Sequence, residues 1–325
     1  MSINAKTYAI VVCGYNEKSN LGRCLHGLLQ TVEQPEDLIF IDDASKDDSF
    51  EWVKEHYPKI TAIKNARNQH YTGVYNKGIR LAMERGKDYV LMINADTEVV
   101  NKIFVKQLIE AAEKLPNSGF LGPKVYYRQK GIIQNTSLLK PTLSRHLFGW
   151  VWWRMRPSSF NRSDGKEHRA EFINTVCCLI RNRTIRDVGL MDESMGIYFD
   201  DVEWMTRAEE RGWFSYYVPV ESIIHHEKPS GYEHYSLKTF MLKRNAVYYM
   251  LRRRGWAEAA IYGCFAVILA VIRCSLAPLK REPLHLHFYF LERIVNVYWN
   301  LLWRKPLGPW FGPPLAFWED SKAEK

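Results

Sequence analysis

The sequence predicts an α/β fold, in which helices flank a mostly parallel sheet, followed by a helical C-terminal region. In the N-terminal third, short apolar runs lead into polar turns and then into amphipathic segments. This repeated order of strand, turn and helix indicates buried parallel strands joined by right-handed helical crossovers. From residue 237 onward, apolar residues recur with a helical period instead. With 46% hydrophobic residues in a chain of 325, the protein can bury a large core.

The expected elements follow from these periods in order along the chain. The predicted strands are residues 7–13, 38–41, 60–63, 89–93 and 220–224. The predicted helices are residues 20–30, a segment ending near 57, 73–85, 102–114, a helix beginning near 200, 237–254, 256–275 and 284–303. Residues 118–180 have an irregular, strand-rich pattern. One large domain is therefore expected over residues 1–235, with halves at about 1–115 and 116–235, and a basic helical region over residues 236–325.

Positive charge is concentrated in the C-terminal region. The formal net charge is +9, and residues 236–325 hold 14 Lys and Arg against 6 Asp and Glu. Because these charges are interleaved with long apolar runs and aromatic residues, contact with anionic lipid head groups is favoured over a merely solvated basic face, and no nucleic acid partner is expected. The six cysteines lack C-x-x-C spacing and the N-terminus lacks an apolar signal segment, so a reducing cytoplasm is expected.

The most apolar part of this region is the uncharged run over residues 259–272. Its 14 residues cover about 21 Å at 1.5 Å per residue, which is less than the roughly 30 Å of a hydrocarbon core. We therefore expect residues 256–275 to lie on the membrane or to be buried in protein. Tilting and bilayer thinning leave a spanning helix open as an alternative.

Polar side chains stand where the predicted strands end. Ligands of parallel α/β sheets bind at the carboxyl ends of the strands. The side chains at these ends are Tyr15, Asn16, Asp42, Asp43, Asn94 and Asp96. Residues 68–78 combine amide side chains, Asn76 among them, with glycines that allow close backbone approach, which suits a loop and helix start beside a ligand. Each group is also ordinary in turns and helix caps, so the prediction depends on their meeting at one edge.

Asp96 is a candidate ligand for a metal ion. It follows an apolar run, and a carboxylate at the tip of a buried strand suits Mg²⁺ or Mn²⁺. The pair His225 and His226 follows the strand predicted at 220–224, and a neutral imidazole beside Asp96 would complete a site that diphosphate oxygens fill out. His225 is slightly favoured over His226. The plainer alternatives are a turn residue and a surface histidine pair.

Two adjacent carboxylates, Asp200 and Asp201, mark the start of a predicted helix. The helix macrodipole favours acidic residues there, so Asp200 could simply be an N-cap with Glu203 completing a capping box. The acidic and amide residues upstream and the histidines downstream favour a shared crevice instead. Residues 149–157, with three Trp and two Arg, are either an acceptor-binding or membrane-facing loop or packed aromatic core.

Taken in order, these motifs resemble glycosyltransferase family 2 over about residues 7–232. The matching positions are Tyr15-Asn16, Asp42-Asp43-x-Ser45, Asn68, Asn76-x-Gly78, Asn94-x-Asp96, Gly189-x-x-Asp192-Glu193, Phe199-Asp200-Asp201-x-Glu203, and His225 with Ser230. The family consists of inverting enzymes of GT-A fold, and the likeness is greatest to its bacterial rhamnosyltransferase-like branch, which builds cell-envelope polysaccharide. The resemblance implies transfer of a sugar from a nucleotide-diphosphate donor to a hydroxyl of a glycan or lipid-linked acceptor.

The resemblance also implies where the donor binds. The nucleotide base would contact Asp42, and the residues expected near the nucleotide are Tyr15, Asn16, Asp43, Asn76 and Asn94. The expected donor is dTDP-rhamnose or a UDP-sugar. An enzyme of this branch is expected in the cytoplasm, at the inner face of the cell membrane.

The metal and the base are assigned by the same likeness. Asn94 replaces the first acid of the family's D-x-D element, which leaves Asp96 as the main ligand of Mg²⁺ or Mn²⁺, with His225 on the metal side. Asp201 matches the second acid of the family's Glu-Asp pair and would be the general base, beside Asp200.

Several positions depart from the family pattern. Asp200 stands where glutamate is commoner and Glu203 where aspartate is, while His70 and Thr175 stand where glycine is usual. These replacements could narrow the donor pocket.

Two other functions are weighed against the transferase. A catalytically inactive nucleotide-binding scaffold of an envelope polysaccharide assembly complex is disfavoured by the retained Asp96, Asp201 and His225. A nucleotidyltransferase is disfavoured because residues 14–17 do not form a basic phosphate-binding loop.

Overall fold

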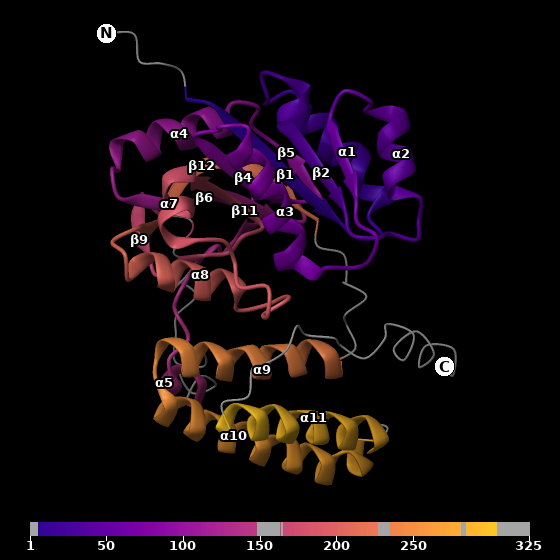
Figure 1. The fold of residues 1–325 in the computed structure, drawn as a ribbon, viewed down its shortest axis with the longest axis vertical. Coiled ribbons are helices and arrows are strands. Elements are labelled where there is room, and N and C mark those ends of the chain that lie inside the picture. The colour runs from indigo at the N-terminus through magenta and orange to yellow at the C-terminus, as the bar shows by residue number, and fades with distance from the viewer. Residues whose placement is uncertain (1–5, 148–162, 164, 227–234, 281–283, 304–325) are drawn as a thin grey trace. The chain divides into compact units, whose positions relative to one another are not determined.

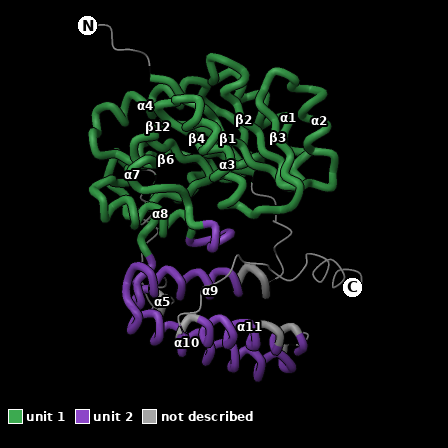
Figure 2. Tube along the Cα trace, in the orientation of Figure 1, with its two compact units in different colours: residues 1–140, 156–192, 200–228 green, residues 141–155, 193–199, 229–325 purple. Residues whose placement is uncertain are grey.

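The chain forms two compact units in a computed structural model (Figure 1). The structure describes residues 6–147, 163, 165–226, 235–280 and 284–303. The first unit comprises residues 1–140, 156–192 and 200–228, and the second comprises residues 141–155, 193–199 and 229–325 (Figure 2). The aromatic stretch 149–157 and Ser230, both singled out in the sequence, lie outside the described residues.

Four parallel strands form the N-terminal half of a ten-stranded sheet in the first unit. They are ordered β3–β2–β1–β4, with the bounds Tyr8–Gly14 (β1), Leu38–Asp42 (β2), Thr61–Lys64 (β3) and Tyr89–Asn94 (β4). Every neighbouring pair in this set runs parallel. The main helices between them are α1 (Lys18–Leu29), α2 (Ser49–His56) and α3 (His70–Glu84), and the single turn η1 (Pro35–Asp37) precedes β2. This half of the sheet is the one that the alternating pattern predicted.

The other half of the sheet is mixed. Beyond β4 the order continues β11–β6–β12–β5, with bounds Cys177–Arg181 (β11), Ser118–Tyr127 (β6), Phe214–His225 (β12) and Thr97–Val99 (β5). Here β11 runs antiparallel to β4 and β6, β12 runs parallel to β6, and β5 runs antiparallel to β12. The short strands are β7 (Ile133–Gln134) beside β6, β9 (His168–Ala170) beside β12, and the separate pair β8 (Ser137–Leu138) and β10 (Phe172–Ile173). The expected predominance of parallel pairing therefore applies only to the N-terminal half.

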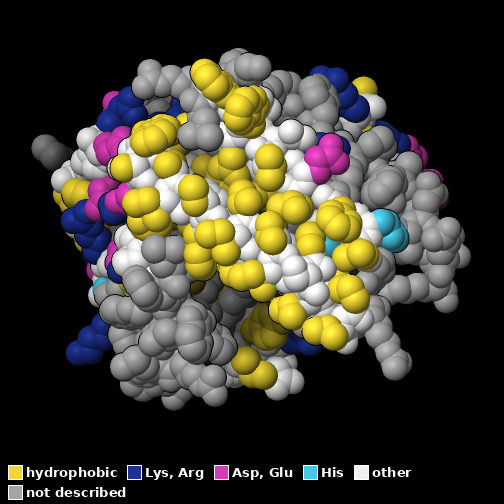
Figure 3. All heavy atoms as spheres, turned by 90° about the horizontal axis from the view of Figure 1, so that it is seen from below, with side chains coloured by type: hydrophobic (Ala, Val, Ile, Leu, Met, Phe, Trp, Pro, Cys, Tyr) yellow, Lys and Arg dark blue, Asp and Glu magenta, His cyan; other side chains and the backbone are white. Residues whose placement is uncertain are grey.

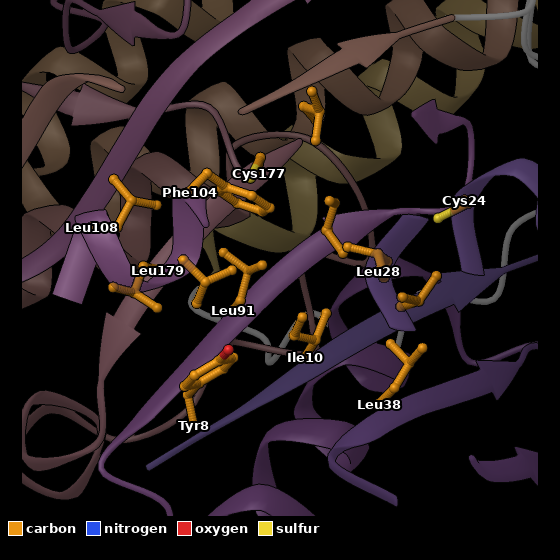
Figure 4. Packing of buried hydrophobic residues seen from close by; sticks show 14 of the residues in the cluster. Tyr8, Ile10, Cys24, Leu28, Leu38, Leu91, Phe104, Leu108, Cys177 and Leu179 are labelled. Atoms are coloured by element: carbon orange, nitrogen blue, oxygen red, sulfur yellow. The ribbon is translucent and has the colours of Figure 1, made fainter. Parts of the chain in front are cut away.

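A hydrophobic cluster of buried residues lies on one face of the sheet. Alternate strand residues point to opposite faces, so Ile10 of β1 and Leu91 of β4 share this side. Leu28 of α1 and Phe104 of α4 (Phe104–Lys114) pack against them (Figure 4). Burying such side chains contributes about 1.5–3 kcal/mol each, which holds the strands rigidly in register.

Helix α3 packs closely against β1. A Cβ added at Gly78 would stand 2.3 Å from Cγ1 of Val11, a distance that no side chain tolerates. Glycine at this position therefore allows α3 to approach the strand closely, and the start of α3 is held beside the strand tips. Two further helices, α7 (Asn182–Val188) and α8 (Asp200–Glu209), complete the first unit.

The second unit is helical. It contains α9 (Tyr235–Arg253), α10 (Trp256–Leu276) and α11 (Leu284–Leu302), with the shorter α5 (Leu143–Leu147) and the turn η3 (Pro278–Lys280). One side of α10 is buried at helical spacing, through Ala259, Tyr262, Gly263, Ala266, Ala270 and Cys274. Gly263 lies against the ring of Tyr298 in α11.

Helix α10 is longer than the uncharged run suggested. It continues through Glu258 and Arg273 to a length of 21 residues, or about 31 Å. In the described part of the chain it is the one helix that is long and apolar enough to cross a membrane, and 33% of its most apolar stretch is buried. At that length α10 could cross a hydrocarbon core of roughly 30 Å, so length does not exclude a spanning helix. Core helices of soluble proteins pass the same test of length and composition, so length does not establish one either.

Candidate active site

The register of the parallel strands brings the predicted residues to one edge of the sheet. Asp42 stands opposite Gly14, and Asn94 stands opposite Cys13. The loops that leave β1, β2 and β4 therefore begin side by side. Tyr15, Asn16, Asp43 and Asp96 follow directly on these positions.

Asn16 joins the loop after β1 to the loop after β2. Its backbone is left-handed, with φ of 56°, and its N–H donates to the hydroxyl of Ser45 at 2.9 Å. Its side-chain oxygen accepts from the N–H of Lys46 at 2.8 Å. Tyr15 beside it is half-buried. The amide of Asn16 thus fixes the shape of both loops.

Asp42 is fully buried at the end of β2. Its Oδ2 accepts from the N–H of Ser45 at 3.0 Å. Among the residues that the structure describes, its Oδ1 has no hydrogen-bond partner. A buried carboxylate oxygen without a partner is costly, and an N–H donor from a ligand would satisfy it.

Asp43 holds the start of α3. Its carboxylate accepts from the side chain of Asn65 at 3.0 Å and from the N–H groups of Gln69 at 2.8 Å and His70 at 3.0 Å. Burial raises the pKa of Asp43, and these bonds partly oppose the rise. His70 has φ of 60°, a left-handed conformation that explains why glycine is usual at this position.

His225 lies beside Asp96. The antiparallel pairing of β12 with β5 sets His225 opposite Thr97. As a result, Nε2 of His225 stands 3.3 Å from Oδ2 of Asp96. The neighbouring His226 instead places its Nε2 2.9 Å from Oε2 of Glu98. Of the two histidines, the strand register thus places His225 next to the candidate metal ligand.

The tautomer of His225 follows from its other nitrogen. Nδ1 lies 2.9 Å from Oε1 of Gln134, an acceptor, which favours the tautomer with the proton on Nδ1 and a lone pair on Nε2. A lone pair and a carboxylate oxygen that face each other suit a shared cation. In the described residues no cluster of three or more His, Cys, Asp or Glu side chains is suited to hold a metal ion. Diphosphate oxygens of a nucleotide are ligands that such a cation accepts.

Asp200 and Asp201 are the first two residues of α8. Asp201 Oδ1 accepts from the N–H of Val202 at 2.8 Å. Burial raises the pKa of Asp201 to about 6, while that hydrogen bond lowers it in part. Glu203, which the capping-box interpretation places at the helix start, has a carboxylate oxygen 3.2 Å from Arg207 one turn on. Arg207 also donates to the carbonyls of residues 188 and 190, at 2.8 and 2.7 Å.

Two tyrosines on α3 contact β4 and the segment before β11. Tyr75 donates to Oδ1 of Asn94 at 3.1 Å, Tyr71 donates to Oγ1 of Thr175 at 2.9 Å, and the ring centroids are 4.6 Å apart. Burial raises the pKa of both hydroxyls. The charges of Asp200 and Asp201 raise the pKa of Tyr71 further, and that of Asp96 acts on Tyr75. The charges of residue 96 and of residues 200–201 therefore act on two neighbouring tyrosines.

Comparison with known sequences decides the family. The profile described as Glycosyl transferase family 2 matches residues 9–189, which is more than half of the chain. This protein belongs to glycosyltransferase family 2. The family resemblance predicted from the motifs is thereby confirmed, and the chain is a glycosyltransferase.

Named relatives of this glycosyltransferase include rhamnosyltransferases. An N-acetylglucosaminyl-diphospho-decaprenol L-rhamnosyltransferase of Mycobacterium tuberculosis is 25% identical over 298 residues, covering 85% of this chain and 96% of that protein. The dTDP-rhamnosyl transferase RfbF of Shigella flexneri is 21% identical over 224 residues, covering 69% of this chain and 70% of the relative. The solved mannosyltransferase PcManGT from Pyrobaculum calidifontis, in complex with GDP-Man and Mn²⁺, matches with a TM-score of 0.52 at 13% identity, covering 93% of this chain and 89% of that one. The fold is the GT-A type expected from the motifs.

Some residues of the glycosyltransferase have contacts that the sequence did not indicate. Asn76, predicted near the nucleotide, donates to the carbonyl of Met191 at 2.9 Å and accepts from its N–H at 3.1 Å. It therefore anchors the segment that leads toward the acid pair. Tyr71 and Tyr75 were missed altogether, because aromatic residues four apart in a helix normally indicate core packing.

Proposed function

We propose that this protein is an inverting, metal-dependent glycosyltransferase that moves a sugar, rhamnose first among the candidates, from a nucleotide-diphosphate donor to a hydroxyl acceptor. The observation that carries the proposal is the shared tyrosine pair. The charge of Asp96, which faces His225, acts on Tyr75, and the charge of Asp201, whose own pKa is raised, acts on the neighbouring Tyr71. Inverting transfer needs a group that holds the departing diphosphate and a base for the attacking hydroxyl, at one site.

The donor nucleotide is assigned to the tips of β1 and β2. The unpartnered Oδ1 of Asp42 fits the imide N–H of uracil or thymine, the bases of UDP- and dTDP-sugars. Asn16 and Asp43 hold the loops around it through their own hydrogen bonds. Two asparagines are assigned to the same edge of the sheet. The amide oxygen of Asn94 accepts from Tyr75, and the side chain of Asn76 donates to the carbonyl of Met191.

The residues present fit a divalent cation. The carboxylate of Asp96 and the lone pair on Nε2 of His225 would hold Mg²⁺ or Mn²⁺, with the remaining ligands supplied by the diphosphate. Such an ion, when bound, neutralises the charge of the departing nucleoside diphosphate. Gln134 keeps the imidazole in the tautomer that can bind it.

Asp201 is assigned as the general base. With its pKa at about 6, most of the carboxyl group is ionised at neutral pH and is still basic enough to take a hydroxyl proton. It would remove the proton of the acceptor hydroxyl as that oxygen attacks the anomeric carbon from the side opposite the leaving diphosphate. Attack from that side inverts the configuration of the anomeric carbon.

The named relatives support a rhamnosyl donor and an envelope acceptor. The mycobacterial relative is described as acting on a decaprenol-diphosphate-linked sugar, and RfbF as a dTDP-rhamnosyl transferase. We extend these descriptions to propose dTDP-rhamnose as donor, ahead of UDP-sugars, and a glycan or lipid-linked acceptor at the cytoplasmic face of the membrane.

The helical unit fits contact with that membrane. Helices α10 and α11 carry many exposed apolar side chains, and Figure 3 shows a face of the molecule on which hydrophobic side chains gather. The exposed residues include Ile261, Ile268, Ile272, Phe288 and Trp299. A helix that is apolar all round, with its outer side exposed, is uncommon in water. Arginines at the junction of α9 and α10 and exposed tryptophans are the residues expected at a lipid surface. We propose peripheral docking on anionic lipid.

The test is Asp201→Asn in a transfer assay. We expect transfer to fall by about 10²–10⁴-fold, because a general base is lost, while affinity for the nucleotide sugar is retained. Donors are first screened by thermal stabilisation and hydrolysis with Mn²⁺ and with EDTA, beginning with dTDP-rhamnose and UDP-hexoses. Asp200→Asn is the matched control.

Each other outcome has a meaning. Full turnover by the Asp201 variant would move the base to another residue, with Asp200 the first to examine. A wild-type protein that binds nucleotide sugars and transfers none would support the scaffold alternative.

A further inference from the structure

The chain leading into the acid pair has an unusual backbone. Tyr198 and Phe199 have φ of 68° and 65°, and they are the only adjacent non-glycine residues with positive φ in the described part of the chain. Left-handed conformation is unfavourable for an aromatic residue, because its Cβ lies too close to the following carbonyl oxygen. Such residues persist where surrounding contacts enforce them. The next two residues are Asp200 and Asp201.

One buried side chain supplies these contacts. Asn245 of α9 is completely buried, and its Nδ2 donates to the carbonyls of Met195, Ile197 and Tyr198, each at 2.8 Å. Two N–H bonds serve three carbonyl groups, so at least one bond is shared. The three acceptors lie within four residues of backbone, and they fix the loop up to the residue before Phe199.

The same face of α9 makes further contacts with the loop. Tyr248, three residues on from Asn245, accepts from the hydroxyl of Ser194 at 3.0 Å. Tyr249, four residues on, has its ring 6.0 Å from that of Phe199. Residues at these spacings lie on one side of a helix. This side of α9 therefore holds the whole segment of residues 193–199, which belongs to the same unit.

We propose that Asn245 is a positioning residue for Asp201. Only the backbone of Phe199 and Asp200 separates the last fixed carbonyl from Asp201, and a change in the left-handed pair would redirect the first turn of α8. Upstream, Met191 is held by two hydrogen bonds with the side chain of Asn76. This inference rests on the proposed role of Asp201 as base, and it makes an element of the helical unit a determinant of catalysis.

The test compares Asn245→Ala with Tyr248→Phe. We expect Asn245→Ala to lower kcat by roughly 10- to 100-fold, the effect of misplacing a catalytic group by about 1 Å. The KM for the donor should change less than about threefold, because Asp42 and Asp96 lie on other elements. Tyr248→Phe removes a hydroxyl of the same helix face that contacts Ser194, at the end of the segment far from Asp201, and it should change kcat less than about threefold.

A double-mutant cycle separates positioning from simple loss of structure. If Asn245 acts through Asp201, then Asn245→Ala will add little to the defect of Asp201→Asn. Full additivity, or an unchanged kcat in Asn245→Ala, would overturn the proposal. If Asn245→Ala does not fold, Asn245→Ser keeps one donor and should have an intermediate kcat, and wild-type kcat in that variant would likewise overturn it.

Failure here is distinct from failure of the proposed function. Turnover by Asp201→Asn would refute the base itself. Loss of turnover in Asp201→Asn together with a normal Asn245→Ala enzyme would refute only the positioning role.

Discussion

Asp201 lies in the first turn of α8, and burial makes its carboxyl group less acidic. Its pKa is raised to about 6. A base works only in its ionised form, so kcat/KM should be level at neutral pH and should fall about tenfold for each pH unit below about 6. Initial rates over the acid range measure this, with nucleotide affinity at each pH as the control. A rate that stays constant down to about pH 5 would indicate a carboxyl group with an ordinary pKa and would contradict the assignment.

The two adjacent histidines offer a matched comparison. His225 faces Asp96, and His226 faces Glu98. His225→Gln should weaken Mn²⁺-dependent binding of dTDP or UDP by at least about tenfold, since loss of a metal partner costs at least as much as loss of its support. His226→Gln should bind as the wild type does. Titration calorimetry with Mn²⁺ and with EDTA measures both variants, and the opposite ranking would reassign the ligand.

Single residues were predictable where a simple local rule applied. Asp42 and Asp96 follow apolar runs, and a polar residue at the tip of a buried strand is visible in the sequence. Tyr71 and Tyr75 were not predictable as site residues, because their spacing is also that of ordinary core packing. Their position beside Asn94 and Thr175 is set by contacts between distant parts of the chain.

At the scale of elements, pairing direction separates what was predicted from what was not. The apolar runs before residue 95 gave β1, β2, β3 and β4, because strands joined by helices pair in parallel. The direction of β11, antiparallel to β4, depends on how residues 118–180 fold back, and no local period records that. The antiparallel pairing of β12 with β5, which places His225 beside Asp96, likewise has no local signal in the sequence.

Strand β12 shows a second limit. It extends well before the strand expected at 220–224, although Pro219 interrupts it. The register shifts between Tyr217 and Glu221, so the proline lies at an irregularity where the ladder does not need its N–H. The loop before α8 is similar, since sequence rules would place glycine rather than Tyr198 and Phe199 in left-handed conformation. There the contacts of Asn245 override the local preference.

At the scale of the whole molecule, the chain assigns the site and the apolar surface to different units. Every candidate site residue belongs to the first unit, whereas the exposed apolar sides of α10 and α11 belong to the second. The surplus of positive charge in residues 236–325 belongs to the same unit as that surface. If the acceptor is lipid-linked, as proposed above, such a surface would keep the enzyme where its substrate is.

Membrane docking predicts a difference between two isoleucines of equal exposure. Ile268 on α10 is 56% exposed, and Ile103 in the first unit is 57% exposed. Ile268→Asp should lower the affinity for anionic liposomes by about 10- to 100-fold, as measured by sedimentation at low salt. Inserting an isoleucine contributes about 1.5–3 kcal/mol, and anionic head groups repel the new carboxylate. Ile103→Asp should bind as the wild type does, because a single exposed apolar residue has no membrane role.

Raising the salt should release part of the protein, as expected where arginines contact anionic head groups. Binding that ignores lipid charge, salt and Ile268 would refute docking, whereas protein that only detergent releases would show that α10 enters the bilayer.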